Sequence, residues 1–126
     1  MELNLSNGEW KLMNALWERS PMTITELVAA LRFDTGWTKH TVITMLNRLE
    51  AKGAVRHEQG SRAKLFYAAV ERRGVAVQET ESFLDRVYGG SVGLMVNTLL
   101  RDHSLKPSDV EELRAILDAA GEERSK

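Results

Sequence analysis

The clearest alternation of apolar and polar positions lies in residues 38–53. Its apolar residues recur at intervals of three and four, which places them along one side of an α-helix: Val42, Met45, Leu46 and Leu49. Thr38 suits the N-cap of this helix, and Gly53 suits the position just beyond its end. The opposite side carries short polar groups and one arginine: His40, Thr41, Thr44, Asn47 and Arg48, with Ile43 at its edge. The pattern therefore predicts a helix with one buried and one exposed side.

Two shorter helices are predicted before this one. Each begins with a capping box, in which a hydroxyl residue is followed three positions later by glutamate: Ser6 with Glu9, and Thr23 with Glu26. The helices should cover about residues 7–19 and 24–32. Between them we expect a short strand at 22–24, and after them a turn at 33–37. Two helices joined by a short turn with a glycine match the spacing of a helix-turn-helix.

A β-hairpin is predicted directly after Gly53. Strands are expected over 54–58 and 64–68, joined by a polar turn over 59–63. A hairpin in this place is the wing of a winged helix, and Arg62 and Lys64 lie at or beside its tip. We therefore predict a mainly α fold with a small β-hairpin (α+β), whose N-terminal winged helix-turn-helix domain covers residues 1–70.

Residues 71–126 are predicted to form a second domain of three helices. Two helices, over 71–88 and 92–100, are separated by Gly89-Gly90, and a third capping box at Ser108–Glu111 should begin the last one. The middle helix is apolar on nearly every side, and three short helices cannot bury so much apolar surface alone. We therefore expect this domain to form a homodimer through the following residues: Phe83, Leu84, Val87, Val92, Met95, Val96, Leu99, Leu113 and Leu117. A small-ligand pocket between these helices is the alternative, but the sequence pattern places no converging polar group there to orient a ligand.

Charge is distributed unevenly along the chain. The whole chain has a net charge of −1, which does not suggest a generic nucleic-acid binder. Residues 36–66, however, hold six Lys or Arg against two acids, a local charge of +4. Residues 71–126 hold eight basic and eleven acidic residues, a local charge of −3. Such an asymmetry indicates a basic contact surface joined to a domain with another role.

A threonine-rich helix side followed by a basic hairpin is typical of a protein that binds double-stranded DNA. Threonine is a mediocre helix former, so three threonines in one helix indicate a role for the exposed side. The helix would read base edges and the wing would contact phosphates. The residues expected at DNA are Thr38, Lys39, His40, Thr41, Ile43, Thr44, Asn47, Arg48, Arg62 and Lys64. The alternatives are a winged helix that contacts only protein, without specific DNA binding, and a solvated wing whose basic residues only confer solubility.

Several other classes of protein are disfavoured by the sequence. The chain has no cysteine, which excludes disulfides, thiolate metal sites and a cysteine nucleophile. Its histidines, His40, His57 and His103, are isolated, and there is no nucleophile motif or phosphate-binding glycine loop. We therefore expect no enzyme activity, no cofactor and no metal. No apolar run reaches 18 residues and no secretory pattern is present, so we expect no membrane insertion and a cytoplasmic location.

Motifs along most of the chain match one known family. They are Ser6-x-x-Glu9-Trp10-x-Leu12-Met13-x-x-Leu16-Trp17, Trp37-Thr38-x-x-Thr41-Val42-x-Thr44-x-Leu46-x-Arg48-Leu49-x-x-Lys52-Gly53, Phe66-Tyr67, Phe83-Leu84-x-x-Val87-Tyr88-Gly89-Gly90 and Glu111-Glu112-Leu113-Arg114. Over roughly residues 5–118 the chain resembles the BlaI/MecI/CopY family of winged-helix repressors, also called the penicillinase-repressor family. The resemblance implies a homodimer that represses transcription from palindromic operators. It also places Thr41, Thr44 and Arg48 at DNA-reading positions and Arg62 and Lys64 at wing contacts.

The chain departs from the family pattern at three places. Members of the copper branch bind metal through Cys-x-Cys motifs, which this chain lacks. Ile43 stands where members of the β-lactam branch often carry a basic residue, so we expect either a different operator or one that is read in part through a thymine methyl group. In that branch a membrane sensor protease triggers cleavage of the dimerisation domain at an Asn-Phe pair. A gap-free count places Thr98-Leu99 there, with Asn97 one residue early, so the resemblance implies cleavage only if a protease accepts this other pair. The inducing signal and the operator sequence stay open.

Overall fold

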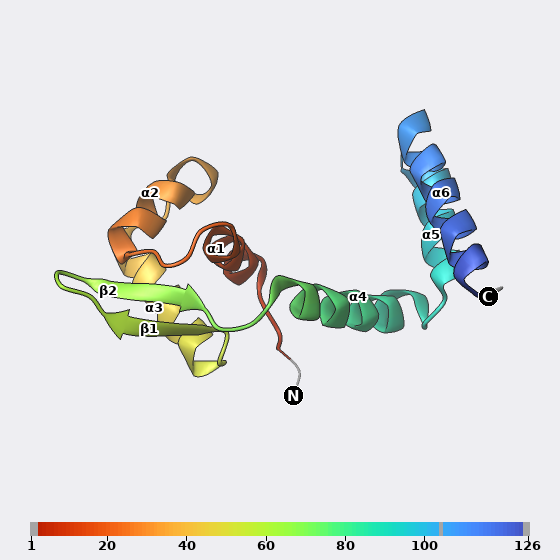
Figure 1. The fold of residues 1–126 in the computed structure, drawn as a ribbon. Helices are drawn as coiled ribbons and strands as arrows, with labels where there is room; N and C mark the ends of the chain where they lie inside the picture. The colour runs from red at the N-terminus through yellow and green to blue at the C-terminus, as the bar shows by residue number, and fades with distance from the viewer. Residues whose placement is uncertain (1–2, 104, 125–126) are drawn as a thin grey trace. The chain divides into compact units, whose positions relative to one another are not determined.

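A computed structural model of the chain describes residues 3–103 and 105–124. The described part contains six helices and one hairpin (Figure 1), which confirms the expected mainly α fold with a small β-hairpin. In chain order the elements are α1 Asn7–Glu18, α2 Ile24–Thr35, α3 Lys39–Ala51, β1 Val55–Gln59, β2 Lys64–Ala68, α4 Arg72–Tyr88, α5 Val92–Asp102 and α6 Pro107–Arg124.

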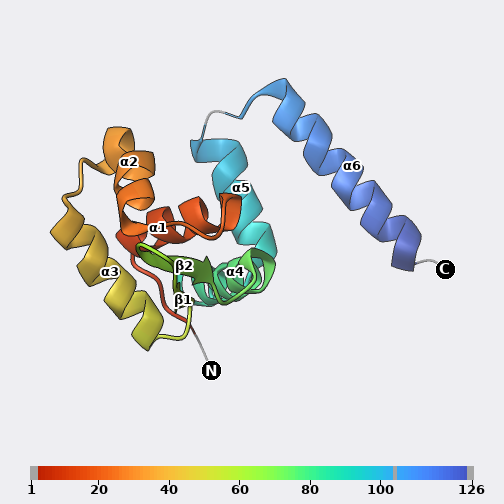
Figure 2. The same ribbon diagram turned by 60° about the vertical axis from the view of Figure 1, so that its left-hand side comes forward.

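The core of the N-terminal part lies where α1, α2, α3 and the hairpin meet. Both ribbon views show these elements gathered in one group (Figure 1, Figure 2). The predicted apolar side of α3 is confirmed, because all four of its residues are buried. Residues from every one of these elements complete the core, among them Leu12, Leu16, Leu27, Leu46, Val55 and Phe66. Burial of the apolar side of α3 determines which side of this helix stays exposed.

The two strands form an antiparallel hairpin in which Val55 lies opposite Ala68 and Gln59 lies opposite Lys64. At the tip, the backbone N–H of Gly60 donates a hydrogen bond to the carbonyl of Ala63 over 2.9 Å. A Cβ atom on Gly60 would lie 2.5 Å from that carbonyl oxygen, so this tight turn requires glycine. The turn holds Arg62 and Lys64 at the end of the hairpin, as the sequence predicts.

The first two capping boxes are confirmed and the third is wrong. The hydroxyl of Ser6 accepts a hydrogen bond from the N–H of Glu9, and the same reciprocal pattern joins Thr23 and Glu26. The last helix begins at Pro107 instead of following Ser108 as its cap. Proline favours the first position of a helix because that position needs no N–H donor. The carboxylate that then reaches back belongs to Asp109, which accepts a hydrogen bond from the N–H of Lys106 over 3.1 Å.

Two connecting segments differ from their predictions. Helix α2 continues into the predicted turn and ends at Thr35, whose hydroxyl donates to the carbonyl of Leu31. Gly36, with a φ of 64°, ends it. The strand predicted at 22–24 is reduced to one isolated bridge between Met22 and Phe66, because α2 already begins at Ile24.

The chain divides into two compact units, Met1–Thr80 and Glu81–Lys126. The first half of α4 belongs to the first unit, where Val75 is buried. Just before α4, the indole N–H of Trp17 donates to the carbonyl of Val70 over 2.9 Å. The domain boundary expected at residue 70 remains a prediction. No helix in the described part of the chain is long and apolar enough to cross a membrane.

Candidate nucleic-acid interface

Helix α3 presents a polar side that its own buried side holds in place. The hydroxyl of Thr38 caps the helix by accepting a hydrogen bond from the N–H of Thr41 over 3.2 Å. Four residues of the polar side, Lys39, His40, Asn47 and Arg48, are exposed, whereas Ile43 and the other two threonines are partly exposed. All of the α3 residues expected at DNA therefore lie outside the core, on or beside one side of one helix.

The threonine hydroxyls of α3 make hydrogen bonds within the helix. Thr44 Oγ1 donates to the carbonyl of His40 over 3.0 Å. The hydroxyls of Thr38 and Thr41 lie 3.2 Å apart, and either can donate to the other. These local bonds use the hydroxyl hydrogen of Thr44 and one of the two hydroxyl hydrogens of Thr38 and Thr41. The three threonines thus present less hydrogen-bonding capacity to a ligand than their number suggests.

Five polar side chains in this region have no partner among the described residues. In the described residues, no hydrogen bond or ion pair involves the side chains of Lys39, Asn47, Arg48, Arg62 or Lys64. All five are exposed. Three of them lie on α3 and two at the hairpin tip. Four of these groups are cations, so the surface is free to bind an anion such as a DNA phosphate.

Two basic residues counted in the local charge of +4 make contacts within the protein instead. Lys52 pairs with Glu9, and Arg56 pairs with Glu58 over 2.9 Å while its guanidinium lies 4.1 Å from the ring centre of Tyr67. Both acids of the segment are also engaged, because Glu50 contacts His57 Nδ1 over 2.7 Å. The basic surface therefore depends on four cations rather than six.

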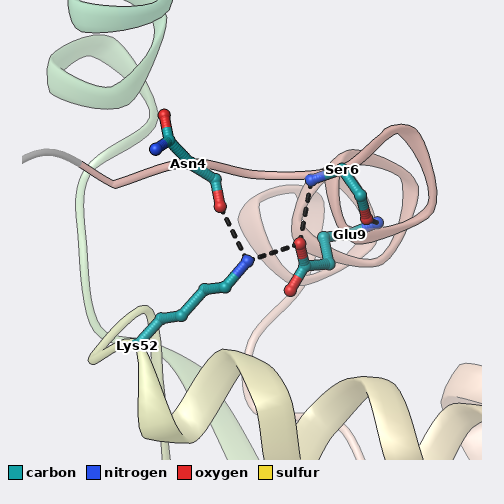
Figure 3. A network of polar contacts seen from close by, with 4 residues as sticks. All are labelled: Asn4, Ser6, Glu9 and Lys52. Carbon is teal, nitrogen blue, oxygen red and sulfur yellow. Dashed lines mark hydrogen bonds and ion pairs between the residues drawn. The ribbon is translucent and has the colours of Figure 1, made fainter.

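Lys52 ties the end of α3 to the start of α1, as Figure 3 shows. Its ammonium group donates to Glu9 Oε1 and to the carbonyl of Asn4, both over 2.7 Å. Glu9 Oε1 also accepts from the N–H of Ser6 over 2.8 Å. Burial alone would raise the pKa of Glu9, but the hydrogen bonds from Lys52 and Ser6 and the charge of Lys52 outweigh it and lower the pKa below its ordinary value of 4.5.

The capping box predicts only part of this network. The contact between Glu9 and Ser6 follows from their spacing of three residues. The contact between Glu9 and Lys52 joins residues 43 positions apart, and no local pattern marks it.

The residues expected at a dimer interface all lie in the second half of α4, in α5 or in α6. None of the nine is buried, and Val92 and Leu117 are 57% and 69% exposed. No residue of α5 or α6 is buried in the described chain. The pair Thr98 and Leu99 lies inside α5, where the hydroxyl of Thr98 donates to the carbonyl of Leu94.

A hollow of about 240 Å³ lies beside α5 and α6. Its lining is Leu99, Leu105, Asp109, Glu112, Leu113 and Ile116. Two of these six residues are acidic, and the expectation that no polar group converges there stays a prediction. The carboxylate of Asp109 already accepts a hydrogen bond from the backbone of Lys106. In the described residues, no group of three or more metal-ligating side chains is found.

Known proteins are similar to this chain over most of its length. The family model described as penicillinase repressor matches residues 5–119. The methicillin resistance regulatory protein MecI of Staphylococcus aureus is 25% identical, over 90% of this chain and 93% of its own length. The penicillinase repressor of Bacillus licheniformis is 29% identical, over 90% of this chain and 89% of its own.

Solved structures share this fold over part or most of the chain. The DNA-binding domain of the repressor BlaI is 27% identical, with a TM-score of 0.51 over 57% of this chain and 90% of its own. Bacillus licheniformis BlaI in complex with the blaP half-operator is 26% identical, with the same TM-score over 57% of this chain and 88% of its own. MarR from E. coli, at 20% identity and a TM-score of 0.52 over 93% of this chain and 78% of its own, shares only the fold. The match over almost the whole chain shows that it belongs to the penicillinase repressor family, a family of transcriptional repressors and not of enzymes.

Proposed function

We propose that this protein is a homodimeric repressor that binds palindromic operators in double-stranded DNA through α3 and the hairpin tip. The observation that carries the proposal is the set of exposed side chains without partners on α3, together with Arg62 and Lys64 at the tip. Water solvates these exposed groups in the free protein, and a phosphate or a base edge can replace that water without breaking a contact among the described residues. The first unit also resembles a BlaI structure solved with a half-operator, which supports DNA as that ligand.

The two parts of this surface are suited to different contacts. Arg48 has a planar guanidinium that can donate two parallel hydrogen bonds to the edge of a guanine in the major groove. Arg62 and Lys64 follow the tight turn at Gly60, where they can reach phosphates beside that groove. Phosphate contacts supply affinity and register, and base contacts supply the choice of sequence. We therefore assign sequence reading to α3 and positioning to the hairpin tip.

Dimerisation is supported by the apolar surface that one chain leaves exposed on its second unit. Leu99 is 40% exposed and Ile116 is 56% exposed, and neither α5 nor α6 contains a buried residue. A second copy would cover this surface and bring a second α3 to the same duplex. With one helix in each major groove, the half-sites should be about one helical turn apart, roughly 34–36 Å, or a multiple of that.

Dimerisation also offers a way to control repression. Each monomer would bind a half-site weakly, and the dimer raises the overall affinity without any new contact to DNA. Anything that separates the copies would therefore relieve repression. Cleavage at Thr98-Leu99 by a membrane sensor protease is one such route. Because this pair lies within α5, the helix would have to open before a protease could bind it in an extended form.

The proposal is tested by enrichment of bound duplexes from a random pool with the full-length chain. We expect a palindromic sequence to be enriched, and its affinity to fall steeply as the salt concentration rises. A winged helix that contacts only protein would enrich no sequence and would show no gel shift even with random duplex at low salt. That outcome would contradict the proposal.

A further inference from the structure

Thr44 occupies the middle of the exposed side of α3. It lies four residues after His40 and four residues before Arg48, so these three side chains follow one another along the helix. It is partly exposed, and Thr41 and Asn47, three residues before and after it, are its other neighbours on the helix surface. A base pair that faces the centre of α3 would therefore meet Thr44.

The single hydrogen of the Thr44 hydroxyl is already in use. A hydroxyl has one hydrogen to donate, and Thr44 Oγ1 donates it to the carbonyl of His40 over 3.0 Å. Threonine in a helix can hold this bond in one of its two favoured rotamers. With Oγ1 turned toward the preceding turn of the helix, the γ-methyl is the group that Thr44 offers to a ligand.

We infer that Thr44 reads a thymine in the operator through its methyl group rather than a base edge through its hydroxyl. This inference rests on the proposed DNA binding and adds the kind of base read at the centre of α3. Thymine is the only base of DNA that carries a methyl group in the major groove, and a threonine methyl can contact it. Such a contact would exclude water from both methyl groups.

The test removes a methyl group from each partner of the contact in turn, first from thymine and then from Thr44, and compares the loss of binding. Each thymine of the duplex enriched by the wild-type protein is replaced in turn by deoxyuridine, which lacks only the 5-methyl group. For the wild type, we expect one thymine in each half-site at which this replacement weakens binding about fourfold, the factor that corresponds to burial of one methyl group. Thr44→Val keeps the methyl group and loses the hydroxyl, so the loss at that thymine should persist.

Thr44→Ser gives the opposite change, because it keeps the hydroxyl and removes the methyl group. We expect it to bind the thymine duplex about fourfold more weakly than the wild type and to show no further loss with deoxyuridine. Thr80→Ser is the matched control, because the hydroxyl of Thr80 makes the same kind of bond, to the carbonyl of Ala76 in α4. It should leave the loss with deoxyuridine unchanged.

Two results would overturn the inference while the proposed function stands. One is a Thr44→Val protein that loses the sensitivity to deoxyuridine while Thr44→Ser keeps it, which would show that the hydroxyl makes the contact. The other is wild-type binding that no deoxyuridine replacement affects. If the wild-type chain enriches no duplex, the proposed function itself fails and the inference falls with it.

Discussion

At the scale of single residues, the arginines on and near α3 differ in how free they are to bind a ligand. Arg48 is exposed and has no partner in the described protein, so its guanidinium can rearrange toward a ligand without breaking an internal contact. Arg56 is different, because its ion pair with Glu58 and its stacking on Tyr67 hold it in place. Equal charge therefore does not mean equal availability to DNA.

Replacement of Arg48 by alanine should weaken binding to the enriched operator by about 1–3 kcal/mol if its guanidinium makes two hydrogen bonds to one base. Binding to random duplex should change much less, and Arg124→Ala, which removes an exposed charge from α6, is the matched control. Fluorescence anisotropy with both duplexes at one salt concentration measures the difference. An equal loss on both duplexes would show that Arg48 contacts only phosphate.

The sequence could predict which residues lie on the exposed side of α3, because helical periodicity determines the side of each residue. It could not predict which basic residues are available. Lys52 lies within the predicted recognition segment but pairs with Glu9. Glu9 lies 43 residues earlier in the sequence, and only folding brings the two side chains together. The use of the Thr44 hydroxyl by the helix backbone was likewise invisible in the sequence.

At the scale of elements, the pair of Glu9 and Lys52 joins the first turn of α1 to the end of α3. The two helices also approach closely at Gly8, where a Cβ atom would lie 2.8 Å from Cε of Met45. Glu9 is only 3% exposed, so its charge is stabilised by the hydrogen bonds it accepts rather than by water. This junction helps to set where α3 lies in the first unit.

Glu9→Gln should lower the free energy of unfolding by about 1–2 kcal/mol at pH 7, because it weakens the hydrogen bond from a charged donor. Glu18→Gln, in the same helix at an exposed position, is the control and should change it far less. Urea unfolding of both variants measures the effect. Equal unfolding midpoints for Glu9→Gln and the wild type would contradict a stabilising role for the pair.

The same pair predicts how stability depends on pH. The pKa of Glu9 in the folded protein is below its ordinary value of 4.5, so the carboxylate stabilises the fold above that pH. This contribution is lost as the pH falls below 4.5 and through the folded pKa. The difference in unfolding free energy between the wild type and Glu9→Gln should therefore shrink as the pH is lowered from 5 to about 3. A difference that stays constant over this range would exclude the linkage.

Most elements could be predicted from the sequence because their signals are local. Apolar spacing, two capping boxes and a glycine at the hairpin tip all act within a few residues of one another. The predictions failed where two local signals compete. Pro107 and Ser108 both suit a helix start, and the proline prevails at the start of α6.

At the scale of the whole molecule, the two units leave different surfaces exposed. The first unit has a buried apolar core, although Phe33 and Val77 stay exposed, whereas the second keeps Val87, Leu100 and Leu117 at least 48% exposed and has no buried residue in the described helices α5 and α6. Exposed apolar residues in such number usually mark a surface that another protein covers. The second unit cannot bury this apolar surface alone, so we expect a second copy of the chain to cover it. The apolar pattern of α5 already indicates this in the sequence.

Leu99→Asp should separate the copies, because an unpaired charge cannot be buried at low cost in an apolar interface. We expect sedimentation to show a monomer and the affinity for the palindromic operator to fall. Asn97→Asp adds the same charge at an exposed polar position of α5 and serves as the control. An intact Leu99→Asp dimer would show that Leu99 lies outside the interface.

The most direct test of the central claim is hydroxyl-radical footprinting of the wild-type protein on its enriched operator. If two copies place their α3 helices in successive major grooves, two protected patches should appear on one face of the duplex, about 10 base pairs apart or a multiple of one turn. A single protected patch, or two patches on opposite faces of the duplex, would contradict the account.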